Sequence, residues 1–404
     1  MEFIKGGVCA AKGFSASGLH AGIRKNKDKK DLALILSSVP CKAAAVYTQN
    51  LVKGAPLLVT EKHLENGTAQ AIICNSGNAN TCNADGIEIA EKMCSCLSAN
   101  SNISENDIIV ASTGVIGQPL DIEPIKKAIP DLVSSLSENG STDACGAIMT
   151  TDTKEKEIAV EFMLGGKTCH IGGIAKGSGM IHPNMATMLV FITSDVSISA
   201  KMLKKALSSD VKNTFNMLSI DGDTSTNDMA TVLANGLADN PEITEDGEDF
   251  TTFMKALNTV TVALCRMIAS DGEGATKMLE CIVTGAKTEP VAKTVAKSVV
   301  CSNLLKAAMF GADANWGRVL CAIGYSGAEV DVNKIDVAFK SRKGKIDVCK
   351  NGCGVDFSED TAKLILSEDE IEILVALNDG IANSTAWGCD LTYDYVKING
   401  DYRT

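Results

Sequence analysis

The chain has 404 residues, 45% of them hydrophobic, so it can bury a large core without help from disulfides or a structural metal. Its formal net charge of −12 opposes attraction to nucleic-acid backbones or anionic membranes, which depends on clustered Lys and Arg. No apolar stretch approaches the length that crosses a bilayer, and residues 1–7 lack the apolar core of a signal peptide. We therefore expect a cytoplasmic protein with neither nucleic-acid nor membrane partners.

Short apolar runs alternate with helical patterns in the first third of the chain. Runs bounded by Gly, Asn and Asp predict strands over residues 71–74 and 108–111. Apolar residues at helical spacing predict helices over residues 86–97 and 125–136. This alternation is typical of an α/β arrangement.

Residues 158–179 instead predict two alternating strands around the turn Leu164-Gly165-Gly166-Lys167, which is a hairpin signal. A Gly-rich loop then leads to a third strand over residues 187–193. The sheet is therefore expected to be at least partly antiparallel.

The second half returns from helices to strands. Helices are predicted over residues 250–268 and 291–309, and strands over residues 334–339, 371–377 and 391–398. Neither a repeat nor a low-complexity linker interrupts the chain. We expect an α/β fold in which mixed, partly antiparallel sheets are sandwiched between helix layers in one compact body.

Three familiar motifs fail on inspection. Residues 165–168 resemble the end of a phosphate-binding loop, but Glu161 stands where the first glycine belongs. Residues 209–212 have Ser-x-x-Lys spacing without the partner motifs of penicillin-recognising enzymes. Residues 221–223 resemble part of a calcium loop, but Thr226 replaces the glycine that an EF-hand needs. We interpret these as a turn, an exposed helix face and an acidic loop.

Metal and histidine chemistry find no clear support either. The fifteen cysteines are odd in number, lie mostly inside apolar runs and read as reduced core thiols. The pairs at 94/96 and 349/353 have no histidine nearby, so no metal site is predicted. His20, His63 and His170 stand in no recognisable relation to a nucleophile or carboxylate, which leaves a histidine-based triad unsupported.

One constellation has a chemical use. Residues 176–192 join a Gly-rich loop, a proline turn and a buried strand that begins at Thr187. A threonine at the head of a rigid strand can attack the carbonyl of the residue before it, here Ala186, and water can then split the resulting ester. Cleavage leaves a hydroxyl and a free α-amine on one residue, and an amine with an unperturbed pKa of about 8 can take the proton of the hydroxyl.

The surroundings of Thr187 suit this chemistry. Lys176 would lower the pKa of the new amine and favour the neutral form that acts as a base. Residues 111–117 end a predicted strand in a Gly turn, where Thr113 and Gly114 can aim a hydroxyl and a backbone N–H at an oxyanion. The plainer alternative is that Thr187 merely begins a core strand and that residues 111–117 form an ordinary turn.

Several long motifs now occur together in a recognisable order. The sequence closely resembles the ornithine acetyltransferases, also called glutamate N-acetyltransferases, nearly from end to end. The shared segments are residues 75–80, 113–114, 176–181, 186–188, 221–228, 271–277 and 315–318.

The resemblance implies a self-processing enzyme like the N-terminal-nucleophile hydrolases. Cleavage between Ala186 and Thr187 would give an α chain, residues 1–186, and a β chain, residues 187–404. The two chains would build one composite α/β body, usually as a heterotetramer of two α and two β chains. Acetyl would pass from N-acetylornithine to Thr187 and then to glutamate, in ping-pong order and without a cofactor. Some family members also accept acetyl-CoA.

The family's site residues carry over position by position. Thr113 and Gly114 become the oxyanion hole. Substrate contacts fall on Thr150, Lys176, Thr187, Glu273, Asn399 and Thr404. We expect Lys176 to pair with a substrate carboxylate and Glu273 with a substrate ammonium. The tail carries Gly400 and Arg403 where the commoner family ending differs, although Asn399 and Thr404 stand at the family spacing.

Two other functions remain compatible with the motif at Thr187. An amidase or aminopeptidase would use the same self-processed nucleophile with water as acceptor. An uncleaved amino-acid-binding protein would share the fold without the chemistry. The sequence also leaves open whether acetyl-CoA is a donor.

Overall fold

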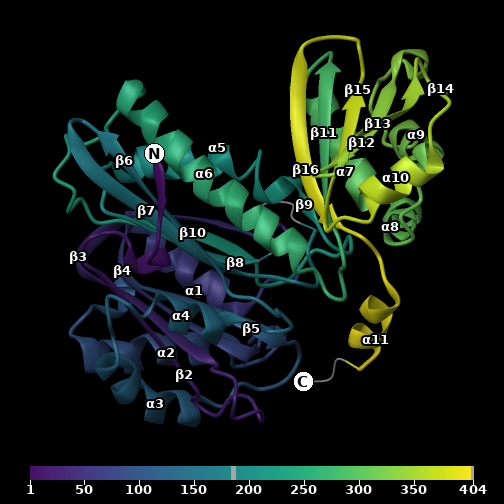
Figure 1. Cartoon of the computed structure of the whole chain (residues 1–404). Helices are drawn as coiled ribbons and strands as arrows, with labels where there is room; N and C mark the ends of the chain where they lie inside the picture. Colours follow the sequence, from purple (N-terminus) through teal and green to yellow (C-terminus); the bar gives the residue numbers. More distant parts are fainter. Residues whose placement is uncertain (183–187, 402–404) are drawn as a thin grey trace.

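Two mixed β-sheets organise the chain in the computed structural model, which describes residues 1–182 and 188–401 (Figure 1). The first sheet has nine described strands. In spatial order they are β1 (Glu2–Ile4), β6 (Lys156–Leu164), β7 (Lys167–Lys176), β8 (Leu189–Ser194), β10 (Met229–Ala234), β3 (Leu32–Tyr47), β4 (Thr68–Asn78) and β5 (Ile108–Val115), with β2 (Phe14–Leu19) also paired to β3.

The central strand β8 shows why this sheet is buried on both faces. All six of its residues are buried, and successive side chains point to opposite sides of a strand. Val190 and Ile192 enter the core that includes α6, whereas Leu189 and Phe191 enter the core that includes α4. A continuous apolar run is the expected signature of such a strand.

Helices therefore cover both faces of the first sheet (Figure 1). The helices α5 (Ala200–Asp210) and α6 (Glu248–Ser270) belong to one hydrophobic core. The other two cores of this sheet contain residues of α1 (Ala55–His63), α2 (Gly86–Ser101), α3 (Ile122–Ser134) and α4 (Ser141–Ile148).

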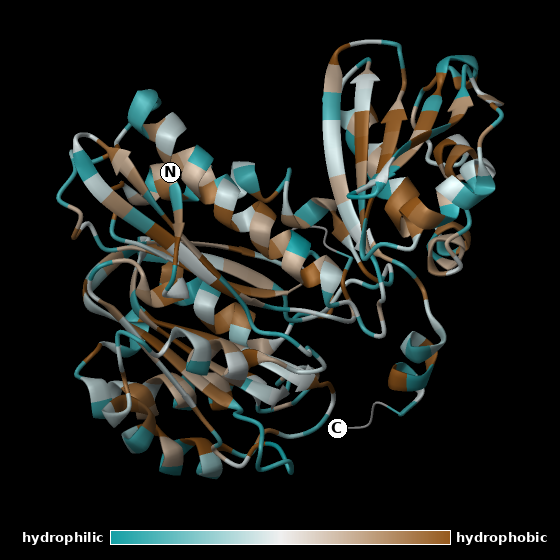
Figure 2. Ribbon diagram, viewed as in Figure 1, coloured by the Kyte–Doolittle hydropathy of each residue, from teal (hydrophilic) through white to brown (hydrophobic). Residues whose placement is uncertain are grey.

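The second sheet has seven described strands and its own helices. In spatial order the strands are β14 (Cys353–Gly354), β13 (Gly344–Lys350), β12 (Asp336–Ser341), β15 (Glu370–Ala376), β11 (Met278–Ala286), β16 (Ala382–Cys389) and β9 (Leu218–Ser219). The helices are α7 (Glu289–Cys301), α8 (Asn303–Phe310), α9 (Trp316–Gly324) and α10 (Glu359–Leu366). Figure 2 shows brown, apolar segments on several of these strands, interspersed with white and teal segments.

The predicted fold class is confirmed, and so are most of its elements. The hairpin over residues 158–179 forms as β6 and β7, which pair antiparallel around Gly165 and Gly166. One predicted helix is divided: α7 ends at Cys301 and α8 begins at Asn303. Ser302 between them is extended, and its hydroxyl accepts a hydrogen bond from Leu305 N as the cap of α8. A serine prefers such a cap to a helix interior.

The strand predicted over residues 391–398 is wrong, because these residues lie in helix α11 (Tyr393–Asp401). The side chain of Asp390 accepts hydrogen bonds from Thr276 N and Lys277 N, and the chain leaves the sheet directly after it. No residue of α11 is buried, and Figure 1 shows the helix standing apart from the second sheet. Without a neighbouring strand, only a helix satisfies the backbone locally.

Three further features bear on function. Among the described residues, no helix is long and apolar enough to span a membrane. All fifteen cysteines are free, and nine of them are buried. The end of β7 lies beside the starts of β8 and β10 at one edge of the first sheet, because Lys176 pairs with Leu189, which pairs in turn with Met229. The end of β5 also reaches this edge, where Thr113 contacts Lys176.

Candidate active site

A small pocket lies at this edge of the first sheet, with a volume of about 120 Å³. Segments far apart in the sequence converge on it: the ends of β5 and β7, the loops around residues 150 and 226, the turn after α6, and α11. Its lining comprises Ala79, Thr113, Gly114, Ile116, Thr150, Thr151, Lys176, Gly179, Met180, Ser225, Thr226, Asn227, Glu273 and Asn399. The pocket thus brings together six of the residues predicted from the sequence, Thr113, Gly114, Thr150, Lys176, Glu273 and Asn399.

Three predicted positions, Ala186, Thr187 and Thr404, lie outside the described residues. Met188, which follows Thr187 in the sequence, lines a small cavity that also contains Thr113 and Lys176.

The turn at Thr113 and Gly114 is shaped by close backbone contact. Gly114 pairs with Gly77 of the neighbouring parallel strand and has a φ of +135°. A Cβ at Gly114 would lie 2.3 Å from the carbonyl carbon of Gly77, so only glycine fits. The side chain of Asn227 holds this turn by donating to the carbonyl oxygens of Ala79 and Ser112, at 2.5 and 3.0 Å.

Lys176 provides the cation of the pocket. It is the last residue of β7, and only 8% of its surface is exposed. Its ammonium nitrogen lies 3.5 Å from the hydroxyl oxygen of Thr113. A fixed positive charge therefore stands beside the predicted oxyanion donor.

Glu273 provides the facing anion. Its backbone N–H donates to Ser178 O at 2.8 Å, which ties the turn after α6 to the loop after β7. A Cβ at Gly179 would lie 2.3 Å from the Glu273 carboxyl carbon, so this glycine makes room for the acid. The side-chain amide of Asn399 in α11 donates to Glu273 Oε2 at 2.7 Å.

Thr150 is fixed by a buried carboxylate that the sequence did not single out. Its N–H donates to Asp152 Oδ2 at 2.9 Å, and Gly177 N donates to Asp152 Oδ1 at 2.7 Å. Burial raises the pKa of Asp152, but the positive charges of Lys156 and Lys176 outweigh this effect and hold the pKa below its usual range. Asp152 is therefore a carboxylate that holds two loops of the pocket.

Asp228 is a second acid that the sequence did not assign. It is buried beside Lys176 in the small cavity that contains Met188. Its Oδ2 has no hydrogen-bond partner among the described residues. Burial raises its pKa well above the usual value, despite hydrogen bonds from Ser225 and Thr48 and the charge of Lys176. The sequence showed Asp228 only as part of a shared motif.

Two of the histidines have carboxylate partners that the sequence did not show. The Nδ1 of His20 lies 3.4 Å from Asp31 Oδ2. His170 does have carboxylate partners, because its Nδ1 lies 2.6 Å from Asp195 and its Nε2 lies 3.2 Å from Glu161. Neither partner could be found by spacing, since the strand pairing of β6, β7 and β8 brings them together. None of these residues lines the pocket.

The other rejected motifs have structural roles. Gly165 and Gly166 form the hairpin turn with positive φ angles. The carboxylate of Asp221 accepts hydrogen bonds from Met180 N and Ile181 N, so the acidic loop anchors the segment after β7. Within residues 1–182 and 188–401, no group of three or more His, Cys, Asp or Glu side chains could hold a metal ion.

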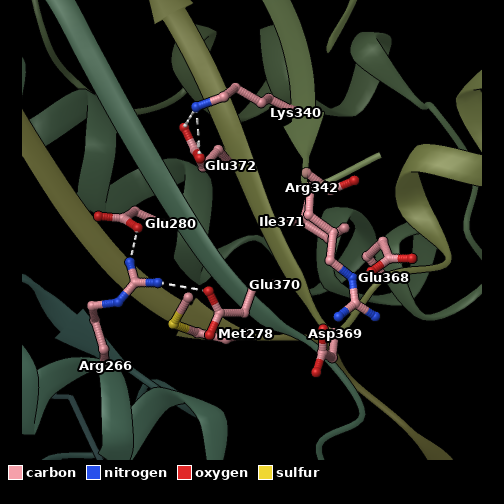
Figure 3. Close-up of a pocket in the computed structure, with 11 residues that line it drawn as sticks. Arg266, Met278, Glu280, Lys340, Arg342, Glu368, Asp369, Glu370, Ile371 and Glu372 are labelled. Carbon is pink, nitrogen blue, oxygen red and sulfur yellow. Dashed lines mark hydrogen bonds and ion pairs between the residues drawn. The ribbon is translucent and has the colours of Figure 1, made fainter. Parts of the chain in front are cut away.

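A larger pocket of about 500 Å³ lies elsewhere and is lined by charged side chains that pair with one another (Figure 3). Arg266 extends from α6 and contacts carboxylates on two strands of the second sheet, which joins the two parts of the fold. The ion pairs are Arg266 with Glu280 and Glu370, Lys340 with Glu372, and Arg342 with Glu368. These pairings make the larger pocket a structural joint, and the small pocket remains the candidate active site.

Comparison with known proteins adds the family context. A family model described as the ArgJ family matches residues 15–404. The "Arginine biosynthesis bifunctional protein ArgJ 1" of Clostridium acetobutylicum is 52% identical over 97% of this chain and 96% of its own length. The "Arginine biosynthesis bifunctional protein ArgJ" of Bacillus subtilis is 47% identical over 99% of this chain and 97% of its own.

A solved structure also resembles part of the chain. The crystal structure of Arginine biosynthesis bifunctional protein argJ from Bacillus halodurans is 48% identical, with a TM-score of 0.50. The match covers 98% of that solved chain but only 52% of this one.

Proposed function

Because the chain belongs to the ArgJ family, we propose that it moves acetyl from N-acetylornithine to glutamate on the hydroxyl of Thr187. The chain is an acetyltransferase of arginine biosynthesis. The observation that carries the residue-level proposal is the pocket that unites Thr113, Gly114, Lys176 and Glu273 from distant parts of the sequence.

The first half-reaction forms an acetyl ester. The Thr187 hydroxyl oxygen attacks the acetyl carbonyl carbon of N-acetylornithine, and its proton passes to the α-amine that cleavage has freed on the same residue. The Thr113 hydroxyl and the Gly114 N–H stabilise the negative charge that develops on the carbonyl oxygen. The C–N bond then breaks, and the amine proton moves to the leaving amino group of ornithine.

The second half-reaction restores the enzyme. The amino group of glutamate attacks the ester carbonyl, and the same two donors hold the oxyanion. The α-amine of Thr187 takes a proton from the attacking amino group, the ester C–O bond breaks, and this proton passes to the Thr187 oxygen as N-acetylglutamate leaves. Every group in both steps belongs to this chain or to a substrate, so the proposal needs neither a metal nor a cofactor.

The charges of the pocket suit amino-acid substrates. Lys176 and Glu273 both line the pocket, and we propose that Lys176 pairs with a substrate carboxylate and Glu273 with the side-chain ammonium of ornithine. Thr150 and Asn399 lie on the same lining and add polar contacts. We propose Thr404 as a further substrate contact.

Self-cleavage between Ala186 and Thr187 has two supports. The match to the solved relative spans nearly all of that chain but about half of this one, which fits a relative divided into two pieces. In the first sheet, β8 and β10 lie between β7 and β3, so both pieces would share one sheet and stay together. We propose an α chain of residues 1–186, a β chain of residues 187–404, and a heterotetramer of two of each.

The proposal also covers the cellular compartment of the enzyme and a second acetyl donor. Arginine biosynthesis relies on free amino acids, and we place the enzyme in the cytoplasm. The relatives from Clostridium acetobutylicum and Bacillus subtilis are named bifunctional. That name supports acetyl-CoA as an alternative donor to the same Thr187 oxygen.

The decisive assay follows the acetyl group. The purified wild-type protein is incubated with N-acetylornithine and glutamate, and N-acetylglutamate, ornithine and free acetate are quantified. We expect N-acetylglutamate and ornithine in equal amounts and little acetate. Acetate without N-acetylglutamate would identify an amidase instead. Denaturing mass analysis of Thr187→Ala should give one full-length chain, whereas the wild type should give two fragments.

A further inference from the structure

A buried ion-pair network stands behind the pocket. Lys156 is the first residue of β6, and its side chain is 1% exposed. Its ammonium nitrogen lies 2.7 Å from Asp152 Oδ1 and 2.5 Å from Asp271 Oδ2. The side chains of the two acids are 0% and 4% exposed. One cation therefore joins two carboxylates that are almost completely buried.

Each carboxylate also fixes backbone near a predicted substrate contact. Asp152 accepts hydrogen bonds from the N–H groups of Thr150 and Gly177, the residue after Lys176. Asp271 accepts hydrogen bonds from Thr153 N at 3.0 Å and from Lys154 N at 3.3 Å. Asp271 itself lies two residues before Glu273. The network thus reaches all three loops that carry Thr150, Lys176 and Glu273.

Further hydrogen bonds link the same segments to one another. The hydroxyl groups of Thr151 and Ser178 are 2.7 Å apart, and Ser178 O accepts the N–H of Glu273. A change in the network would therefore shift the loops as a group. Hydrogen-bonded partners behind a site commonly hold the contacting residues in place in this way.

Electrostatics connect the network with the pocket. Lys176 joins Lys156 in lowering the pKa of Asp152, although burial acts against both. Two lysines thus balance Asp152 and Asp271 in a region of low dielectric. A buried ion pair adds little stability compared with well-packed apolar residues. Removal of one partner, however, leaves the other charge buried without compensation, which destabilises the fold. The network therefore has more to do with geometry than with net stability.

We propose that Lys156 is a positioning residue for acetyl transfer, which sets the distance between the carboxylate-binding Lys176 and the ammonium-binding Glu273 by clamping Asp152 to Asp271. Asp152 and Lys156 precede the proposed cleavage position and Asp271 follows it, so the clamp also joins the α chain to the β chain. This inference rests on the proposed function for its substrates. Lys156 itself is not among the residues that line the pocket.

The test compares Lys156→Met, Lys156→Arg and the control Lys306→Met in steady-state acetyl transfer. Lys306 is also a buried lysine, but its ammonium donates to Ile220 O rather than to a carboxylate of the network. We expect Lys156→Met to raise the KM for both N-acetylornithine and glutamate about tenfold, with kcat changed less than about threefold, because binding residues are displaced while the oxyanion donors stay. Lys156→Arg should recover most of the loss.

A purely structural role predicts a different pattern. Loss of folded protein lowers kcat in proportion and leaves KM unchanged, and thermal unfolding of each variant measures that loss. Unchanged KM values in Lys156→Met, or an equal rise in Lys306→Met, would overturn the proposal. If Lys156→Met does not fold, Asp271→Asn removes one partner of the ammonium with little change in shape, and it should show the same rise in KM.

The proposed function fails separately. A wild-type protein that transfers no acetyl to glutamate would refute the function before any variant is compared. A wild-type protein that transfers acetyl while Lys156→Met keeps both KM values would refute the positioning role alone.

Discussion

The ammonium nitrogen of Lys176 lies 3.5 Å from the hydroxyl oxygen of Thr113, at the point where β7 and β5 end in one pocket. The two residues come from different strands, yet both are almost fully buried. Because Lys176 donates to the Thr113 oxygen, the hydroxyl hydrogen of Thr113 is left to donate to another acceptor.

This relationship makes Thr113 the clearest test of the oxyanion site. Thr113→Val keeps the shape of the side chain and removes its hydroxyl. We expect kcat to fall about 100-fold with little change in KM, since an oxyanion donor acts mainly in the transition state. Steady-state kinetics with N-acetylornithine and glutamate measure both constants. A kcat within about twofold of wild type would remove Thr113 from the mechanism.

Gly114 and Gly117 form a matched pair for the same turn. Both have positive φ angles, +135° and +77°, but a Cβ would meet the Gly77 backbone only at Gly114. Gly117→Ala should cost about 1 kcal/mol of stability from its backbone angle alone. Gly114→Ala adds a clash with backbone, so it should lose about 3 kcal/mol or more and lack transferase activity. Chemical denaturation compares the two, and equal losses would contradict the close approach.

Acid should destabilise the segment around His182. Burial, followed by the charge of Lys297, lowers the pKa of His182 from 6.5 to about 4. The unfolded chain therefore binds a proton at a higher pH than the folded chain, so stability is present above pH 6.5 and is lost as the pH falls toward 4. His182→Asn should reduce the fall in Tm between these pH values. The same fall in Tm for both proteins would assign the effect to other groups.

Asp228 should show the opposite trend. Burial raises its pKa above the ordinary 3.8, so the unfolded chain loses its proton first and the folded state is weakened as the pH rises. Asp228→Asn stays neutral, so its Tm should exceed that of the wild type by a margin that grows from pH 5 to pH 8. Thermal unfolding over this range tests the trend, and a constant difference would argue against a protonated Asp228.

Local patterns in the sequence were sufficient for much of the fold. The turn at Gly165 and Gly166 has a direct backbone cause, and the apolar run of β8 reports burial on both faces. The helix at residues 393–401 could not be predicted in the same way. Its alternating apolar residues are typical of a strand. The segment forms a helix because no described strand lies beside it to pair with its backbone.

Some residues of the candidate site could be predicted from the sequence, and others could not. The shared motifs named Lys176 and Glu273, and the structure places both on one pocket. Lys156 gave no signal, because a lysine that opens an alternating strand is usually at the surface. Its partner Asp271 is 115 residues away in the sequence, and only the packing of α6 beside β6 brings the two together. Contacts of this kind depend on tertiary structure that no local pattern contains.

The central claim is that Thr187 carries acetyl between two amino acids. The direct measurement is the intact mass of the denatured protein after incubation with N-acetylornithine alone and again after addition of glutamate. The account predicts two fragments, with the fragment that begins at Thr187 heavier by one acetyl group until glutamate removes it as N-acetylglutamate. Acetyl transfer by an uncut chain, or an acetyl group on any other residue, would contradict it.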